Sequence, residues 1–129
     1  MRMVGIVIVS HIRKLAEGVI ELTRMMAESV PAAPAGGLED GSPGTSYHLI
    51  RKAIDSVYSE DGVIVLVDMG SAAMTTKMVI EMEETDRNVV MADCPLVEGA
   101  VTASVDAEMN LSLPEILEDL NKVASTPKF

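Results

Sequence analysis

Short apolar runs alternate with amphipathic segments along the whole chain, and this order constrains the fold more than any other feature. Val4–Val9 and the run GVIVLV at 62–67 are apolar at almost every position, which is typical of strands buried on both faces of a sheet. Two weaker strands are expected at Ser29–Ala35, where two prolines favour a place near the sheet edge, and at Asn88–Ala92.

Each of these strands is followed by a segment with the apolar spacing of a helix. The clearest helix signals are a cap for the second helix at Thr45 or Ser46 and a capping-box pair, Ser112 and Glu115, for the last one. Four β-then-α units predict parallel strands joined by right-handed crossovers. We therefore expect an α/β fold, an open doubly wound sheet of four mainly parallel strands with helices on both faces.

The third helix carries methionines at every fourth position. Met74, Met78 and Met82 recur at helical spacing, and such a row is more often part of a core or of dimer packing than of a specialised site.

Length, charge and cysteine content narrow the class of protein. A chain of 129 residues predicts a single domain over residues 1–129. Its net charge of -10 and its three aromatic residues argue against binding nucleic acid or anionic lipid. The sequence shows no secretory leader and no apolar run of membrane-spanning length, and Cys94 is its single cysteine. We therefore expect a cytoplasmic protein without membrane insertion.

Polar groups and glycines follow the predicted strands. In an open α/β sheet the carboxyl ends of the strands meet at one edge, where ligands bind at the point of strand-order reversal. The residues that reach this edge are Ser10, His11, Gly37, Asp68, Gly70 and Ser71.

Histidine and aspartate at the same edge could form a phosphoryl-accepting pair. A neutral imidazole nitrogen of His11 is a nucleophile, and a carboxylate at the other nitrogen, here Asp68, fixes the tautomer. Ser71, where a helix begins, can hold the anionic group with its hydroxyl and nearby N–H groups. From these residues alone, an unreactive histidine at a helix start is the commoner outcome. His48, inside a predicted helix, is interpreted as a surface or satisfied histidine.

Four segments together resemble a known family. GIVIVSHIRKLAEGV, AGGLEDGSPGTS, VLVDMGSAAM and CPLVEGAVTAS occur in the order and spacing of the signature segments of mannose-type EIIA domains of the phosphoenolpyruvate (PEP)-dependent phosphotransferase system. The resemblance covers residues 3 to 123. The chain resembles most strongly the branch that serves as phosphoryl-carrier subunit of bacterial dihydroxyacetone kinase. The reason is that the run DMGS is shorter than the corresponding run of sugar-transporting members.

The resemblance implies a mechanism and partners. His11 would accept a phosphoryl group from the carrier protein HPr and pass it to ADP on the nucleotide-binding kinase subunit, while a third subunit binds dihydroxyacetone. Asp68 matches the aspartate that orients the histidine. Ser71, Gly70, Ser10 and Gly37 are expected at the phosphate. Members are homodimers, and neither a metal nor a bound cofactor is expected, since the phosphoryl group is carried on His11 itself.

Two alternatives remain open at this point. One is an EIIA component of a mannose-type sugar-transporting system, which passes phosphate to a transporter's B domain. The other is a non-enzymatic flavodoxin-like or receiver-like binding module. A receiver needs acidic residues after its first strand, where Ser10 and His11 stand, and the few aromatic residues argue against stacking a flavin ring.

Overall fold

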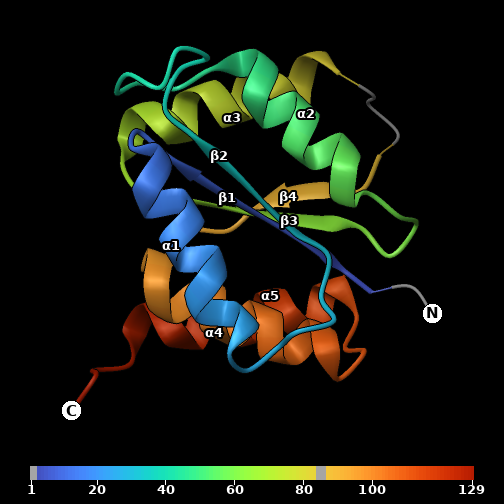
Figure 1. The fold of residues 1–129 in the computed structure, drawn as a ribbon. Helices are drawn as coiled ribbons and strands as arrows, with labels where there is room; N and C mark the ends of the chain where they lie inside the picture. Colours follow the sequence, from blue (N-terminus) through green and yellow to red (C-terminus); the bar gives the residue numbers. More distant parts are fainter. Residues whose placement is uncertain (1–2, 84–86) are drawn as a thin grey trace.

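The computed structural model describes residues 3–83 and 87–129. Four parallel strands form one sheet in the order β2-β1-β3-β4, and five helices connect or follow them (Figure 1). In chain order the elements are β1 (Gly5–Ser10), α1 (Arg13–Arg24), β2 (Ala32–Gly36), α2 (Tyr47–Val57), β3 (Val63–Val67), α3 (Gly70–Met82), β4 (Val89–Met91), α4 (Leu96–Glu108) and α5 (Leu113–Ser125). The predicted α/β class and doubly wound sheet are confirmed.

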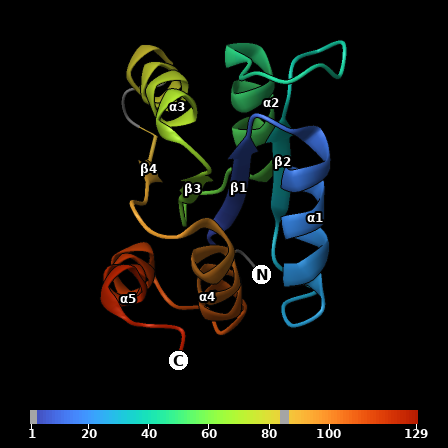
Figure 2. The same ribbon diagram turned by 90° about the vertical axis from the view of Figure 1, so that its left-hand side faces the viewer.

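The two central strands are buried on both faces, as their unbroken apolar runs predict. Residues of β1 alternate between two separate cores: Ile6 and Ile8 pack toward α1, α4 and α5, whereas Val7 and Val9 pack toward α2 and α3. Figure 2 shows these two helical layers on opposite sides of the sheet. The predicted edge position of the proline-containing strand is confirmed, because β2 pairs with β1 alone.

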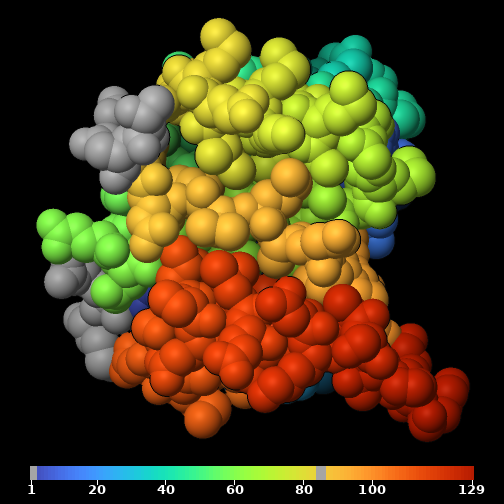
Figure 3. All heavy atoms as spheres, turned by 180° about the vertical axis from the view of Figure 1, so that it is seen from behind, coloured from blue at the N-terminus to red at the C-terminus, as the bar shows by residue number. Residues whose placement is uncertain are grey.

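Capping residues mark where helices α2 and α5 begin. Ser46 caps α2 by accepting a hydrogen bond from the N–H of Leu49, with 3.1 Å between donor and acceptor. The capping box of Ser112 and Glu115 begins α5 as predicted. Figure 3 shows the molecule from behind, with α5 across the lower part of this face and the C-terminal residues projecting from it. Within residues 3–83 and 87–129, none of the helices is long and apolar enough to cross a membrane.

The methionine row of α3 faces away from the core. Met74, Met78 and Met82 are 70%, 51% and 71% exposed, so the prediction of core packing is wrong within this chain. The buried face of α3 is instead made by smaller residues, Ala72, Thr76 and Val79. A period of four residues marks one side of a helix but does not say which side meets the sheet. Dimer packing by these methionines stays a prediction.

Candidate active site

His11 lies between β1 and α1, at the carboxyl edge of the sheet. It precedes the helix, because Ile12 has extended backbone angles and α1 begins at Arg13. Its backbone is held from two sides: the N–H donates to Asp68 Oδ2 at 3.0 Å, and the carbonyl accepts from the N–H of Gly44 at 2.9 Å. Strands β1 and β3 are neighbours at the point where strand order reverses, so the fold itself brings His11 and Asp68 together.

Asp68 follows β3, and its carboxylate accepts four hydrogen bonds. Oδ2 accepts from the Ser10 hydroxyl at 2.9 Å and from the His11 backbone. Oδ1 accepts from His11 Nδ1 at 3.0 Å and from the Met69 N–H at 2.7 Å. Burial by itself raises the pKa of Asp68, but the hydrogen bonds from His11 and Ser10 outweigh it and hold the pKa below its ordinary value. The side chain is therefore an anion at neutral pH.

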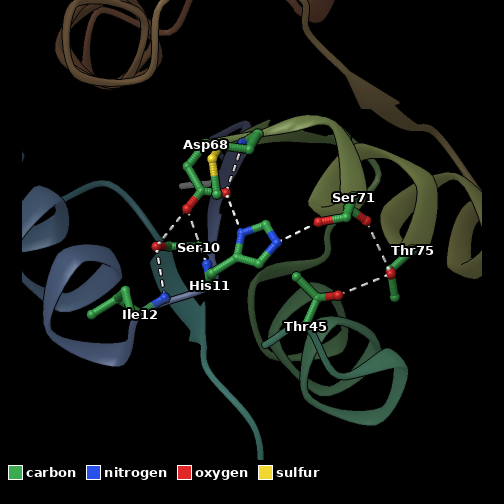
Figure 4. Close-up of polar contacts among 8 residues, drawn as sticks. Ser10, His11, Ile12, Thr45, Asp68, Ser71 and Thr75 are labelled. Carbon is green, nitrogen blue, oxygen red and sulfur yellow. Dashed lines mark hydrogen bonds and ion pairs between the residues drawn. The ribbon is translucent and has the colours of Figure 1, made fainter. Parts of the chain in front are cut away.

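An ionised carboxylate decides the tautomer of the neutral imidazole. Because Asp68 can only accept, Nδ1 of His11 carries the ring proton and Nε2 keeps its lone pair. The hydroxyl of Ser71 meets Nε2 in a short hydrogen bond, and with this tautomer the hydroxyl is the donor. Figure 4 shows the ring between the two partners. The His11 and Asp68 side chains are 19% and 11% exposed, so the pair is sheltered but open on the Nε2 side.

The first turn of α3 lies beside Nε2. Gly70 and Ser71 are its first two residues, and both are exposed. No partner for their backbone N–H groups is seen within residues 3–83 and 87–129, as is usual for the first amides of a helix. A side chain at Gly70 would meet open space, so the approach to these amides is clear. The helix dipole and the free donors make this a suitable place for an anion next to His11.

Ser10 and Gly37 reach the same edge but serve other groups. Ser10 is fully buried, and its hydroxyl donates to Asp68 while accepting from the Ile12 N–H at 3.0 Å. The Gly37 N–H donates to the Ser10 carbonyl at 3.1 Å, with a φ of 70°. These bonds argue against a direct contact of either residue with a phosphoryl group, for which both were predicted. Their positions support the shape of the site and the ionisation of Asp68.

Sequence reasoning missed three residues next to the site. Gly44 and Thr45 come from the loop before α2, and Thr75 comes from the second turn of α3 (Figure 4). The segment GTS was visible in the sequence, but no periodic pattern connects it with α3. His48 is exposed on α2, as predicted for a surface histidine.

Comparisons with known proteins identify relatives of this chain. A family model described as EIIA-man, the PTS system fructose IIA component, matches residues 5–117. The phosphotransferase subunit DhaM of the PTS-dependent dihydroxyacetone kinase of Lactococcus lactis is 39% identical over 92% of this chain and 94% of that protein. The phosphoryl donor subunit DhaM of the PEP-dependent dihydroxyacetone kinase 2 of Listeria innocua is 34% identical over 94% of this chain and 99% of that protein.

Longer relatives and solved structures extend these comparisons. The DhaM subunit of Escherichia coli is 37% identical over 91% of this chain, which covers only 26% of that protein. A crystal structure of a protein of unknown function matches with a TM-score of 0.86 and 27% identity, over 100% of this chain and 99% of the other. The dihydroxyacetone kinase of C. freundii, at 17% identity and a TM-score of 0.68 over 25% of its chain, shows likeness of fold alone. The chain therefore belongs to the EIIA-man family of the phosphotransferase system.

Proposed function

We propose that this chain is the phosphohistidine carrier of a PEP-dependent dihydroxyacetone kinase. It accepts a phosphoryl group from HPr on His11 and passes it to ADP on the nucleotide-binding subunit, which serves a subunit that binds dihydroxyacetone. The proposal rests on two hydrogen bonds of the His11 ring, from Nδ1 to Asp68 and between Nε2 and Ser71. They leave Nε2, the nucleophilic nitrogen, facing a serine hydroxyl and the free amides at the start of α3. The DhaM names of its relatives supply the kinase system.

The tautomer of His11, with its proton on Nδ1, determines how the first phosphoryl transfer proceeds. The lone pair of His11 Nε2 attacks the phosphorus of the donor's phosphohistidine, and the donor's N–P bond breaks, leaving the lone pair on the donor ring. The Nδ1 proton stays between His11 and Asp68, so the carboxylate stabilises the positive charge of the phosphorylated ring. The Ser71 hydroxyl leaves Nε2 and donates to a phosphoryl oxygen, beside the amides of α3.

The second transfer uses the same groups in reverse. A β-phosphate oxygen of ADP attacks the phosphorus, the bond to Nε2 breaks, and its electron pair returns to the ring. Ser71 can then donate to Nε2 again. In each step one N–P bond breaks and one new bond to phosphorus forms, so no oxidant or reductant is needed.

The partners and the assembly belong to the same proposal. Relatives of nearly the same length as this chain are named as kinase subunits, which supports action together with separate proteins such as HPr. A homodimer is expected from the family resemblance, and the exposed methionine row of α3 offers one surface for it. The donor and ADP place the reaction in the cytoplasm.

Phosphorylation by a reconstituted donor system tests the proposal. Phosphoenolpyruvate, enzyme I and HPr should add the mass of one phosphate to this chain, as an acid-labile and base-stable group. ADP-loaded kinase subunit should then remove it and form ATP. His11→Ala should abolish labelling, whereas His48→Ala, which alters the exposed histidine of α2, should leave it unchanged. A wild-type chain that gains no phosphate would overturn the proposal.

A sugar-transporting role is the second candidate. It is favoured by the family description, which names the fructose IIA component of the phosphotransferase system. In that case, the phosphorylated chain should transfer to the B domain of a transporter faster than to ADP on a kinase subunit. Parallel transfer assays with the two acceptors decide between the roles. Either outcome favours phosphate transfer over the flavodoxin-like and receiver-like alternatives.

A further inference from the structure

A second set of hydroxyl groups lies behind Ser71. The hydroxyl of Thr75 donates to the Ser71 carbonyl at 3.2 Å, and the hydroxyl oxygens of Thr75 and Thr45 are 3.0 Å apart. Figure 4 shows these side chains below the first turn of α3, with Thr45 coming from a different element. Thr45 and Thr75 are both half-buried. Neither residue is needed for the chemistry at Nε2 as described above.

Counting protons gives the direction of each bond. A threonine hydroxyl has one proton, and that of Thr75 is donated to Ser71. The oxygen of Thr75 therefore accepts, and Thr45 is the donor between the two hydroxyls. The series runs from Thr45 to Thr75 to the backbone of Ser71, whose side chain donates to His11.

The bond from Thr75 alone has an ordinary explanation. Threonines inside helices commonly bond to the carbonyl four residues earlier, and such a bond needs no functional role. The bond from Thr45 is different. Thr45 lies 30 residues from Thr75 in sequence, and its hydroxyl donates from the loop before α2 to a residue of α3. A loop hydroxyl in this position could instead have pointed to solvent.

The loop before α2 is bonded directly to His11 and, through Thr75, to Ser71. Gly44 donates its N–H to the carbonyl of His11 at 2.9 Å, and the next residue, Thr45, reaches Ser71 through Thr75. Two consecutive residues of one loop thus hold the histidine and the serine. A shift of the loop would change the separation of Nε2 and the Ser71 hydroxyl.

We propose that Thr45 and Thr75 are positioning residues, which fix the Ser71 hydroxyl relative to Nε2 of His11 through their hydroxyl–hydroxyl bond. This inference rests on the proposed function for its consequence, the control of phosphoryl transfer, but the positioning itself is a property of the unphosphorylated chain. With the bond intact, Ser71 donates to Nε2 before transfer and reaches a phosphoryl oxygen after it. Without the bond, the first turn of α3 loses its tie to the loop.

Valine variants test the proposal because valine keeps the branched shape and removes the hydroxyl. Thr45→Val and Thr75→Val are compared with Thr76→Val, on the same helix, whose hydroxyl has no hydrogen-bond partner within residues 3–83 and 87–129. Imidazole ¹⁵N resonances report the tautomer and the bond to Nε2 without any transfer reaction. We expect the Nε2 resonance of Thr45→Val and Thr75→Val to move toward that of a nitrogen without a donor, and that of Thr76→Val to stay in place.

Transfer rates give the second measurement. Phosphorylation by HPr should be about threefold to tenfold slower in Thr45→Val and in Thr75→Val, because a displaced donor stabilises the transferring group less. The double variant should be no slower than Thr75→Val, since Thr45 acts through Thr75. Thr45→Ser and Thr75→Ser should restore both the resonance and the rate.

The outcomes separate the two proposals. If the threonine variants match Thr76→Val in resonance and rate, or if the serine variants fail to rescue them, the positioning role is wrong. Additive effects in the double variant would contradict the route through Thr75. If the resonances shift as expected while the wild-type chain accepts no phosphate, the positioning role holds and the proposed carrier function fails.

Discussion

Two sheltered aspartates of this chain have opposite acidities. Asp68, at the active edge of the sheet, accepts four hydrogen bonds, and its pKa lies below the ordinary value. Asp106, on α4, is 9% exposed, and its Oδ2 has no hydrogen-bond partner within the described parts of the chain. Burial, together with the neighbouring carboxylates of Asp119 and Glu115, raises the pKa of Asp106 to about 7.

The difference lies in the supply of donors. Burial disfavours the charged form of both carboxylates, and only Asp68 has enough N–H and O–H groups to reverse the effect. Asp106 instead lies near the carboxyl groups of Asp119 and Glu115, which together with burial favour its protonated form. Hydrogen-bond donors thus keep Asp68 charged, whereas burial near other carboxyl groups favours the neutral form of Asp106.

The largest expected effect comes from removing the charge of Asp68. Asp68→Asn keeps the size of the side chain but cannot accept the Nδ1 proton in the same way, so the tautomer with a free Nε2 is lost. The rate of phosphorylation by HPr should fall by about 10²- to 10⁴-fold. Label uptake over time measures it, with Asp93→Asn, an exposed aspartate after β4, as the control. A rate close to wild type would show that Asp68 does not orient His11.

Removing the charge of Asp106 is expected to stabilise the protein at high pH. Its raised pKa means that the folded protein binds an extra proton between about pH 4 and pH 7, so this contribution to stability is full at low pH and is lost as the pH rises through about 7. Asp106→Asn stays neutral and can donate to Asp119. The variant should be about 1–2 kcal/mol more stable than wild type at pH 8 and nearly equal at pH 4.

Denaturant unfolding at the two pH values checks this prediction. Glu118→Gln, which removes an exposed carboxylate of α5, should show little dependence of its effect on pH. A loss of stability in Asp106→Asn at both pH values would contradict a raised pKa of Asp106 as the source of the effect.

A smaller effect is expected when Asp68 loses one donor. Ser10→Ala removes the hydroxyl that donates to Oδ2 and should cost about 1 kcal/mol of stability at pH 7. Because the pKa of Asp68 is lowered on folding, its contribution to stability is present above the ordinary value near 3.8 and is lost as the pH falls below it. The cost should therefore shrink below pH 3. Unfolding curves of Ser29→Ala, which alters an exposed serine between α1 and β2, should match wild type. A cost for Ser10→Ala that is independent of pH would contradict this account.

The sheet and the proximity of His11 to Asp68 could be predicted because they depend on regular patterns. Unbroken apolar runs mark β1 and β3, and parallel topology places the residues that follow them, His11 and Asp68, at one edge. The edge strand β4 was predicted over Asn88–Ala92 and is shorter, Val89–Met91. An edge strand pairs on one side only, so its ends are weakly specified by sequence.

Contacts between irregular segments could not be predicted in this way. Ser10 was expected at the phosphate, yet its burial directs the hydroxyl to Asp68, which depends on the depth of the strand end in the fold. The bond between Thr45 and Thr75 joins a loop to a helix, and no repeat spacing indicates it. The influence of Asp119 on Asp106 likewise depends on the packing of α4 against α5, which sequence periodicity does not orient.

The arginine next to the site bears on the energy of the phosphorylated state that we propose. Arg13 follows the reactive residue by two positions, but its guanidinium donates to the carbonyl of Leu38 at 3.3 Å. In the proposed carrier, an Arg13 held in this way would leave the charge of a phosphoryl group on His11 to hydroxyl and amide dipoles. An ion pair there would deepen the intermediate and slow its onward delivery. An intermediate held by dipoles stays close in energy to both the donor before it and the acceptor after it, as reversible relay requires.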